Sequence, residues 1–334
     1  MAAGSSVVPA QRHEHPSATI ASRAVRYLTA LLIIVTLNFL LPRMMPGDPV
    51  MNIVGEEAYY GSGEALDVLR ADLGLDEALH VQYGRYLAGL ATGDWGYSYL
   101  YLQPVRESIT LHLGWTLALV LPSVILAALI AALLGSIAAW RRGSRTDVGL
   151  SGVHLFIYSM PHYWLAMLLL LVFSFKLGWF PLGRATSAGV SGLPYLIDVG
   201  WHMLLPLLVV TAFKAAYDFL IVRNSVVSIL GEDYVLMAQA KGLSGMAVLF
   251  RHALRNALAP LVTVTAIQFG MVLSGALLVE VVFSWPGMGT LIYDAIGARD
   301  YPLLQSAFLI IAVCVLIANF IADLLYPQLD PRTR

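Results

Sequence analysis

Apolar residues gather in six long runs along the chain, separated by polar segments of very different lengths. A helix needs about 20 apolar residues to cross roughly 30 Å of hydrocarbon, because every backbone amide must be satisfied within the segment. We therefore expect an all-α polytopic membrane protein. The six runs predict transmembrane helices at about residues 27–42, 113–139, 153–175, 199–222, 258–279 and 302–322.

The overall composition agrees with this pattern. Hydrophobic residues make up 58% of the 334 positions and charged residues only 12%, and the mean hydropathy is +0.74. Soluble domains contain about 45–50% apolar residues even when glycine is counted. The formal net charge of −1 argues against a nucleic-acid partner, because binding phosphates requires a cationic excess. The one cysteine, Cys314, excludes an intrachain disulfide and a cysteine-based metal cluster, and we expect no metal site.

The basic residues indicate the orientation in the membrane, because Lys and Arg accumulate in short cytoplasmic loops. Twelve basic residues share one side of the membrane with both termini. Seven lie on the other side, but four of these are in the long first loop, where the rule carries little weight. The side with twelve, and with it both termini, is therefore predicted to be cytoplasmic. Its basic residues are Arg12, Arg23, Arg26, Arg141, Arg142, Arg145, Arg223, Lys241, Arg251, Arg255, Arg332 and Arg334.

The chain divides into five segments. Residues 1–23 form a polar tail rich in Ser, Ala and Pro, which we expect to be disordered. Residues 24–42 form the first transmembrane helix, and we interpret it as retained because no small-x-small cleavage site follows it. Residues 43–110 make an extracytoplasmic loop domain. Residues 111–325 contain helices 2 to 6, and 326–334 form a cytoplasmic C-terminal tail.

The outer loop is acidic and too rich in apolar residues to be a simple tether. Its apolar positions predict helices over residues 64–73 and 77–90. Gly93, Asp94, Trp95 and Gly96 then predict a turn. Two interpretations stay open: a folded cap that stabilises the outer face, and a docking surface for an extracytoplasmic partner.

Lys214 and Asp218 are the clear charged pair inside a predicted span. Their spacing of four residues places them on one face of a helix, where they can neutralise each other. Charged residues inside a membrane are costly and often functional. The pair is therefore either structural or part of a pathway or gate.

The fourth loop, residues 231–258, contains two helix-compatible runs that meet at a glycine. Glu232 and Asp233 begin the first run and Lys241 ends it, which is the charge order that a helix dipole favours. Gly242 suits a left-handed C-terminal cap. The loop therefore predicts a rigid elbow, a name kept below for residues 231–258.

The second half of the elbow begins at Ser244, a favourable N-cap, and we expect Pro260 to close it. An apolar stripe predicts the buried face of this helix: Met246, Leu249, Phe250, Ala253, Leu254 and Ala257. A simple return to the membrane would need only about 2–8 residues.

Two interpretations of the elbow remain. Arg251 and Arg255 would suit an interfacial helix lying on acidic lipid. That interpretation does not account for the break at Gly242 or for the small residues Ala238 and Ala240, which would let another protein chain come close.

Several catalytic motifs are absent from the sequence. The chain has three lysines, and none follows a glycine, so it contains no G-x-x-x-x-G-K-[ST] phosphate loop. It also contains no H-E-x-x-H and no G-x-S-x-G motif. We therefore expect that the chain is not an enzyme, holds no cofactor of its own and does not bind ATP.

At the elbow the sequence resembles a known family. DYVLMAQAKGLSGMAVLFRHALRNALAP is similar to the EAA-type loop of ATP-binding-cassette (ABC) importer permeases, specifically the B-type subunit of the dipeptide, oligopeptide and nickel group. Further matching stretches follow in order along almost the whole chain: RMMPGDPVMNIVG, DLGLDEALHVQYGRYLAGLATGDWGYS, FSFKLGWFPLG, VEVVFSWPGMG, ARDYPLLQ and DLLYPQLDPRTR. The charged Lys214 and Asp218 and the bulky Trp95 depart from the family's usual residues.

The resemblance implies a MetI-like transmembrane domain in the inner membrane of a prokaryote. Its implied partners are a homologous second permease of the C type, two cytoplasmic ATPase subunits that bind ATP and Mg, and an extracytoplasmic substrate-binding protein. The implied ATPase-coupling residues are Ala238, Ala240, Lys241, Gly242, Leu243, His252, Arg255, Asn256 and Pro260. The implied residues facing the binding protein are Gly47, Asp48, Pro49, Gly93, Asp94, Trp95 and Gly96.

The resemblance also implies a function, namely import of short peptides by alternating access driven by the partner ATPases. Similar permeases carry nickel chelates, glutathione or oligosaccharides, so these substrates stay open. A stand-alone secondary transporter or channel that uses Lys214 and Asp218 as an ion relay is the main rival. No inverted repeat supports that rival, and a membrane-embedded hydrolase would lack its nucleophile motif.

Overall fold

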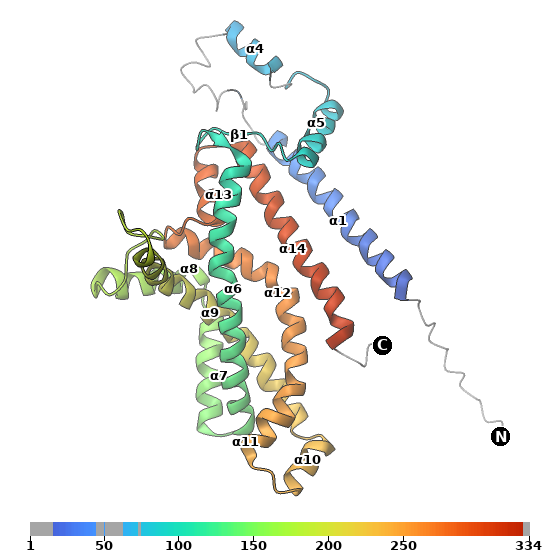
Figure 1. Ribbon diagram of the computed structural model, residues 1–334, viewed down its shortest axis with the longest axis vertical. Helices are drawn as coiled ribbons and strands as arrows, with labels where there is room; N and C mark the ends of the chain where they lie inside the picture. The colour runs from blue at the N-terminus through green and yellow to red at the C-terminus, as the bar shows by residue number, and fades with distance from the viewer. Residues whose placement is uncertain (1–15, 45–49, 51–62, 73–74, 330–334) are drawn as a thin grey trace, which may run out of the picture.

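The computed structural model describes residues 16–44, 50, 63–72 and 75–329, and helices dominate these residues (Figure 1). The long helices are α1 (Pro16–Met44), α6 (Val105–Trp140), α9 (Leu193–Ile229), α12 (Leu254–Val282) and α14 (Tyr301–Leu329). The shorter elements are α4 (Gly63–Asp72), α5 (Leu79–Thr92), β1 (Tyr97–Ser98), β2 (Gln103–Pro104), α7 (Arg145–Tyr158), α8 (His162–Leu169), η1 (Leu170–Lys176), α10 (Asp233–Ala240), α11 (Gly245–Ala247), η2 (Val248–Ala253) and α13 (Met288–Gly297).

Five of the six predicted spans lie inside the five long helices. Among the described residues, three helical stretches are long and apolar enough to cross a membrane: Val105–Trp140, Leu193–Ile229 and Tyr301–Ile321. A fourth is reached if one bent pair counts as a span, and the apolar part of α1, Ala24–Leu40, is shorter. The count of six spans and the cytoplasmic side of the termini therefore stay predictions.

The third predicted span is not one straight helix. Helix α7 ends at Tyr158, and the direction changes by 101° before α8 and η1 continue from His162 to Lys176. Pro161 stands directly before α8. Because proline lacks an N–H and disfavours helical backbone in the residue before it, the break falls here. Figure 1 shows α8 turning sideways out of the bundle.

Both ends of the described chain are more helical than the sequence predicts. Helix α1 begins at Pro16, so residues 16–23 belong to a helix and not to the disordered tail that we expect. Proline suits the first helical position, because the N–H that it lacks would have no partner there. Helix α14 continues to Leu329, beyond the expected boundary at residue 325. Residues 1–15 lie outside the described part.

The contact between α6 and α9 is the central seam of the bundle. Leu119 and Val120 of α6 pack with Val209 and Phe213 of α9 in one half of it. In the other half, Ala131, Ala138 and Ala139 pack with Phe219, Val222 and Val226. Small residues allow membrane helices to approach closely. Gly135 is an example, because a Cβ there would lie 3.0 Å from the Cβ of Val222.

The outer loop folds as the sequence predicts in its described residues. Helices α4 and α5 match the two predicted helices within two residues at each end. The two-stranded hairpin β1–β2 that follows is fixed to the start of α14 by the buried Asp300. This carboxylate accepts hydrogen bonds from Ser98 Oγ at 2.6 Å, from Leu100 N at 3.1 Å and from Leu303 N at 3.1 Å.

The close approach at Gly135 generates a first prediction. Gly135→Leu places a side chain where α9 already lies, so we expect the protein to lose about 1–3 kcal/mol of stability. Gly114→Leu, in the same helix with no atom within 4 Å of a Cβ, is the matched control. Thermal denaturation in detergent measures both variants. Equal melting temperatures for the two would contradict the tight α6–α9 seam.

Candidate functional site

The elbow lies at one end of the bundle, and the β1–β2 hairpin and α13 lie at the other (Figure 1). Helix α10 ends in a Schellman motif, because Gly242 N donates to Gln239 O and Leu243 N donates to Ala238 O. Gly242 has φ +81°, a left-handed conformation that glycine adopts without strain. The predicted cap at Gly242 is therefore confirmed.

The second half of the elbow also begins where the sequence predicts. The hydroxyl of Ser244 accepts from Ala247 N at 3.4 Å and caps α11. Gly245 lies so close to the indole of Trp140, at the end of α6, that a Cβ would come within 2.7 Å of it. The turn after Gly242 therefore rests directly on the end of α6.

Apolar packing and one side-chain bond make the elbow rigid. Val235, Ala238 and Val248 are buried together between its two halves. Asn256 Nδ2 donates to the hydroxyl of Tyr234 at 2.7 Å, which joins the start of α10 to the start of α12. The predicted stripe faces the bundle at Leu249, Phe250, Ala253, Leu254 and Ala257, whereas Met246 is exposed.

The tip of the elbow is exposed and largely apolar. Leu236, Met237, Leu243 and Met246 are 49%, 58%, 44% and 60% exposed. Exposed large apolar side chains outside the predicted spans are typical of an interaction site. The exposed members of the predicted coupling set are Ala240, Lys241, Gly242, Leu243, Arg255, Asn256 and Pro260.

Two residues of that set, Ala238 and Pro260, differ from the expected picture. Ala238 is only 6% exposed, so its small side chain serves the packing between the two halves of the elbow. His252 is half-buried in η2. Pro260 does not close the unit, because α12 runs through it to Val282. Membrane helices tolerate an internal proline when neighbouring groups satisfy the freed backbone carbonyl.

Lys214 and Asp218 form the predicted pair in α9. Lys214 Nζ donates to Asp218 Oδ1 at 2.5 Å and to Thr265 Oγ1 of α12 at 3.2 Å. The two residues are 4% and 0% exposed. Asp218 Oδ2 has no partner among the described residues. The sequence predicts the pair but not Thr265, which lies 51 positions from Lys214.

A second ion pair lies nearer the elbow and joins α7 to α9. Arg223 donates two hydrogen bonds to the Asp147 carboxylate, from Nε to Oδ1 at 2.6 Å and from Nη2 to Oδ2 at 2.7 Å. Gly143 N also donates to Oδ2 at 2.9 Å. From the sequence, Arg223 counts only as a loop charge, because its partner lies 76 positions away.

Glu280 is a buried carboxyl group near the C-terminal end of α12, with 0% exposure. Its Oε2 accepts from Gly289 N at 2.6 Å, across the turn that joins α12 to α13. Thr116 of α6 accepts from Met288 N at 2.7 Å in the same turn. A Cβ at Gly287 would overlap the Glu280 carboxyl group, and one at Gly289 would overlap the carbonyl of Leu277. The sequence offers one signal, a single acidic residue inside an apolar run that ends shortly before Pro-Gly.

The described outer-loop residues form the turn that the sequence predicts. Gly93 and Gly96 have positive φ, and Gly96 N donates to Asp94 Oδ1 at 3.3 Å. Asp94 and Gly96 are exposed, whereas Trp95 packs against the cluster formed by α6, α13 and α14. The predicted residues 47–49 (Gly47, Asp48 and Pro49) lie outside the described part.

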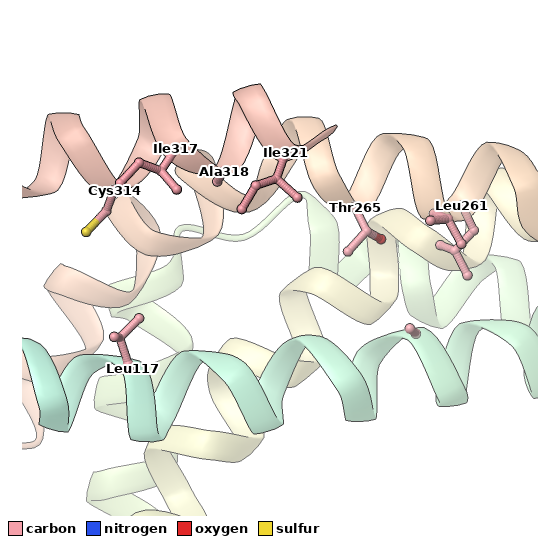
Figure 2. Close-up of a pocket in the computed structure, with 9 residues that line it drawn as sticks. Leu117, Leu261, Thr265, Cys314, Ile317, Ala318 and Ile321 are labelled. Carbon is pink, nitrogen blue, oxygen red and sulfur yellow. The ribbon is translucent and has the colours of Figure 1, made fainter. Parts of the chain in front are cut away.

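A cavity of about 510 Å³ lies between α6, α12 and α14. Figure 2 shows Leu117 of α6 facing Cys314 and Ile317 of α14 across the cavity, and Thr265 of α12 also lines it. Most of its described lining is apolar. Thr265 therefore has the cavity beside it and Lys214 of α9 within hydrogen-bonding distance.

The fold and the elbow together define a membrane-embedded transport subunit, and comparison with known proteins names the family. The model of the binding-protein-dependent transport system inner membrane component matches residues 131–334, and the model of the N-terminal part of such components matches residues 18–120. The chain therefore belongs to the family of binding-protein-dependent transport system inner membrane components.

Individual relatives cover almost the whole chain. A di/tripeptide transport system permease protein, DppB, of Pseudomonas aeruginosa is 39% identical over 314 residues, covering 89% of this chain and 93% of that protein. A glutathione transport system permease protein, GsiC, of Salmonella paratyphi A is 37% identical over 317 residues, covering 94% and 98%. The MetNI methionine ABC transporter, solved in inward-facing conformations, shares the fold with a TM-score of 0.54 at 16% identity over 66% of this chain and 96% of that one.

The turn after α12 generates a second prediction. Gly289→Ala introduces a methyl group against the backbone of Leu277, so we expect a loss of about 1–3 kcal/mol. Gly297→Ala, in the same helix α13 with open space around it, should change stability by no more than about 0.5 kcal/mol. Thermal denaturation measures the stability of both variants. An unchanged melting temperature for Gly289→Ala would contradict the close approach of Gly289 to Leu277.

The Asp147–Arg223 ion pair generates a third prediction. Arg223→Ala leaves a nearly buried carboxylate without its main partner, and we expect a loss of about 3 kcal/mol. Arg142→Ala removes an exposed arginine near the same turn and should change stability by less than about 0.5 kcal/mol. Chemical denaturation in detergent measures both. Equal losses of stability in the two variants would contradict a specific contribution of the Asp147–Arg223 pair to the stability of the fold.

Proposed function

We propose that this chain is the permease subunit of an ABC importer that moves short peptides into the cytoplasm by alternating access. In this proposal it pairs with a homologous C-type permease. Two cytoplasmic ATPase subunits bind ATP and Mg and carry out the hydrolysis, and an extracytoplasmic binding protein delivers the solute. The family and the names of its relatives support this assignment.

The observation that carries the proposal is the exposed apolar tip of a rigid elbow at one end of the bundle. Leu236, Met237, Leu243 and Met246 present a surface that a groove of a soluble subunit can cover. The elbow is joined at both ends to long helices, because α9 leads into it and α12 leads out of it. A displacement of its tip is therefore transmitted to two helices of the bundle.

The opposite end supplies the second partner surface of the proposal. Asp94 and Gly96 are exposed in a turn that Trp95 fixes to the bundle. Residues 47–49 belong to the same proposed surface. Nearby, burial and the carboxylate of Asp294 raise the pKa of Tyr101 to about 12.

Peptides are the proposed solute class because relatives named for peptide, dipeptide and di/tripeptide transport cover about nine tenths or more of the chain. The glutathione transport relatives favour a second candidate of similar size and polarity. Isothermal calorimetry of the cognate binding protein with dipeptides, tripeptides and glutathione separates the two. Binding of none of these would contradict the solute class.

The elbow generates a fourth prediction. Leu243→Asp with Met246→Asp introduces two charges into the exposed tip. Because neither side chain is buried, the fold should persist. We expect co-purification of the ATPase subunits and ATP-driven uptake to fall at least about tenfold, which corresponds to about 1.4 kcal/mol of binding free energy.

Leu102→Asp is the control, because Leu102 is a leucine that is 73% exposed, more than Leu243 or Met246, and it lies in the β1–β2 hairpin at the opposite end of the molecule. It should leave ATPase binding unchanged. Full ATPase assembly and uptake in the elbow variant would refute the proposed docking surface.

A further inference from the structure

A hydrogen bond between Lys214 and Thr265 joins the middle of α9 to the middle of α12. Asp218, one turn along the same helix, holds the ammonium group at 2.5 Å, and the second donor of that group crosses to Thr265 at 3.2 Å. Both charged side chains are buried. The ion pair lies within one helix, and its connection to Thr265 lies between two.

Stability alone does not account for this arrangement. Charged residues are costly to insert into a membrane, and replacing a buried ion pair by apolar residues is often neutral or stabilising. An ion pair four residues apart in one helix also adds nothing to the contact between helices. The crossing bond to Thr265 is the feature that apolar residues could not supply.

The position of the bond relates it to the elbow. Leu249, Ala253, Ala257 and Leu261 form an apolar seam with α9 that runs from the elbow along α12. Thr265 comes one helical turn after Leu261, so its bond to Lys214 continues the seam beyond its apolar part. Helices α9 and α12, which lead into and out of the elbow, are therefore joined by apolar packing near the elbow and by the Lys214–Thr265 hydrogen bond further along.

The surroundings of Thr265 show why a polar contact matters at this level. The cavity between α6, α12 and α14 lies directly beside it, so α12 has open space there (Figure 2). On the α9 side, His162 and His154 of the bent span stack on Phe213 and Phe219, with ring centroids 4.0 Å apart in each pair. Helix α9 is therefore held by packing where α12 has room to shift.

We propose that Lys214, Asp218 and Thr265 form a brace that makes α9 and α12 move as one lever when the elbow is displaced. Lys214 and Thr265 are positioning residues in this mechanism, and Asp218 orients the ammonium group. Without the brace, α12 slides along α9 into the adjacent cavity, and part of the elbow's displacement does not reach the outer halves of the helices. The inference rests on the proposed function of the elbow.

The test uses the complete importer in proteoliposomes and measures solute taken up per ATP hydrolysed. Thr265→Val removes the crossing bond and keeps the ion pair. We expect uptake per ATP to fall about tenfold, while ATPase activity continues. Thr265→Ser keeps the hydroxyl and should restore the wild-type ratio. Thr211→Val is the matched control, because Thr211 is a buried threonine of α9 whose hydroxyl has no partner among the described residues.

A distance measurement gives a readout that is independent of transport. Spin labels at Leu208 of α9 and Leu278 of α12, both exposed, are introduced in a Cys314→Ala background. We expect one narrow distance with and without ATP when Thr265 is present, and a broad or second distance after Thr265→Val. If Thr265→Val does not assemble, Lys214→Met with Asp218→Leu removes the bond without leaving an unpaired charge.

The outcomes separate the two proposals. An unchanged ratio of uptake to ATP together with unchanged label distances in Thr265→Val would overturn the brace. Absence of any ATP-driven uptake by the wild-type assembly would overturn the proposed function. In that case the label distances in the wild-type and Thr265→Val chains still decide whether the bond couples the two helices.

Discussion

A polar group inside an apolar medium must find its partner within the protein, and this requirement organises the whole molecule. Hydrocarbon offers no hydrogen bonds to backbone amides, so the chain crosses it as helices. The same rule governs the buried side chains. Asp147 lies against Arg223, Asp218 against Lys214, and Glu280 against the amide of Gly289. Asp147 and Glu280 each contact a residue beyond their own helix, and Lys214, the partner of Asp218, reaches Thr265 of α12, so satisfying these charges also fixes where the helices lie.

Glycine has a different structural role at each end of the bundle. At the elbow, Gly242 adopts a left-handed conformation in open space, and the residues around it are exposed. At the other end, Gly287 and Gly289 are required because a carboxyl group and a backbone carbonyl leave no room for a side chain. The glycine at the elbow therefore shapes an exposed turn, whereas the two glycines at the other end permit a tight contact between α12 and the start of α13. This asymmetry agrees with a subunit that receives a displacement at the elbow.

Much of the fold follows from local patterns, and much of the site follows from them as well. The apolar runs place α6, α9, α12 and α14, and the spacing of glycine, serine and charged residues places the cap at Gly242 and the start of the second elbow helix. The errors are also local in cause. A single proline turns the third span by 101°, whereas α12 continues through Pro260, where the sequence predicts an end. A hydropathy pattern reports how apolar a segment is and contains no information on its direction.

The sequence is sufficient for the properties that arise between near neighbours: helical class, membrane insertion, the pairing of Lys214 with Asp218 and the polarity of the elbow helices. The folded chain adds every relation between distant positions. Thr265 contacts Lys214 from 51 positions away, and Asp147 contacts Arg223 from 76 positions away. Ala238 is buried inside the elbow, although its small size predicts a surface that another chain approaches. The reason is physical, because helical periodicity constrains residues within a few turns, whereas contacts between helices depend on how whole surfaces pack.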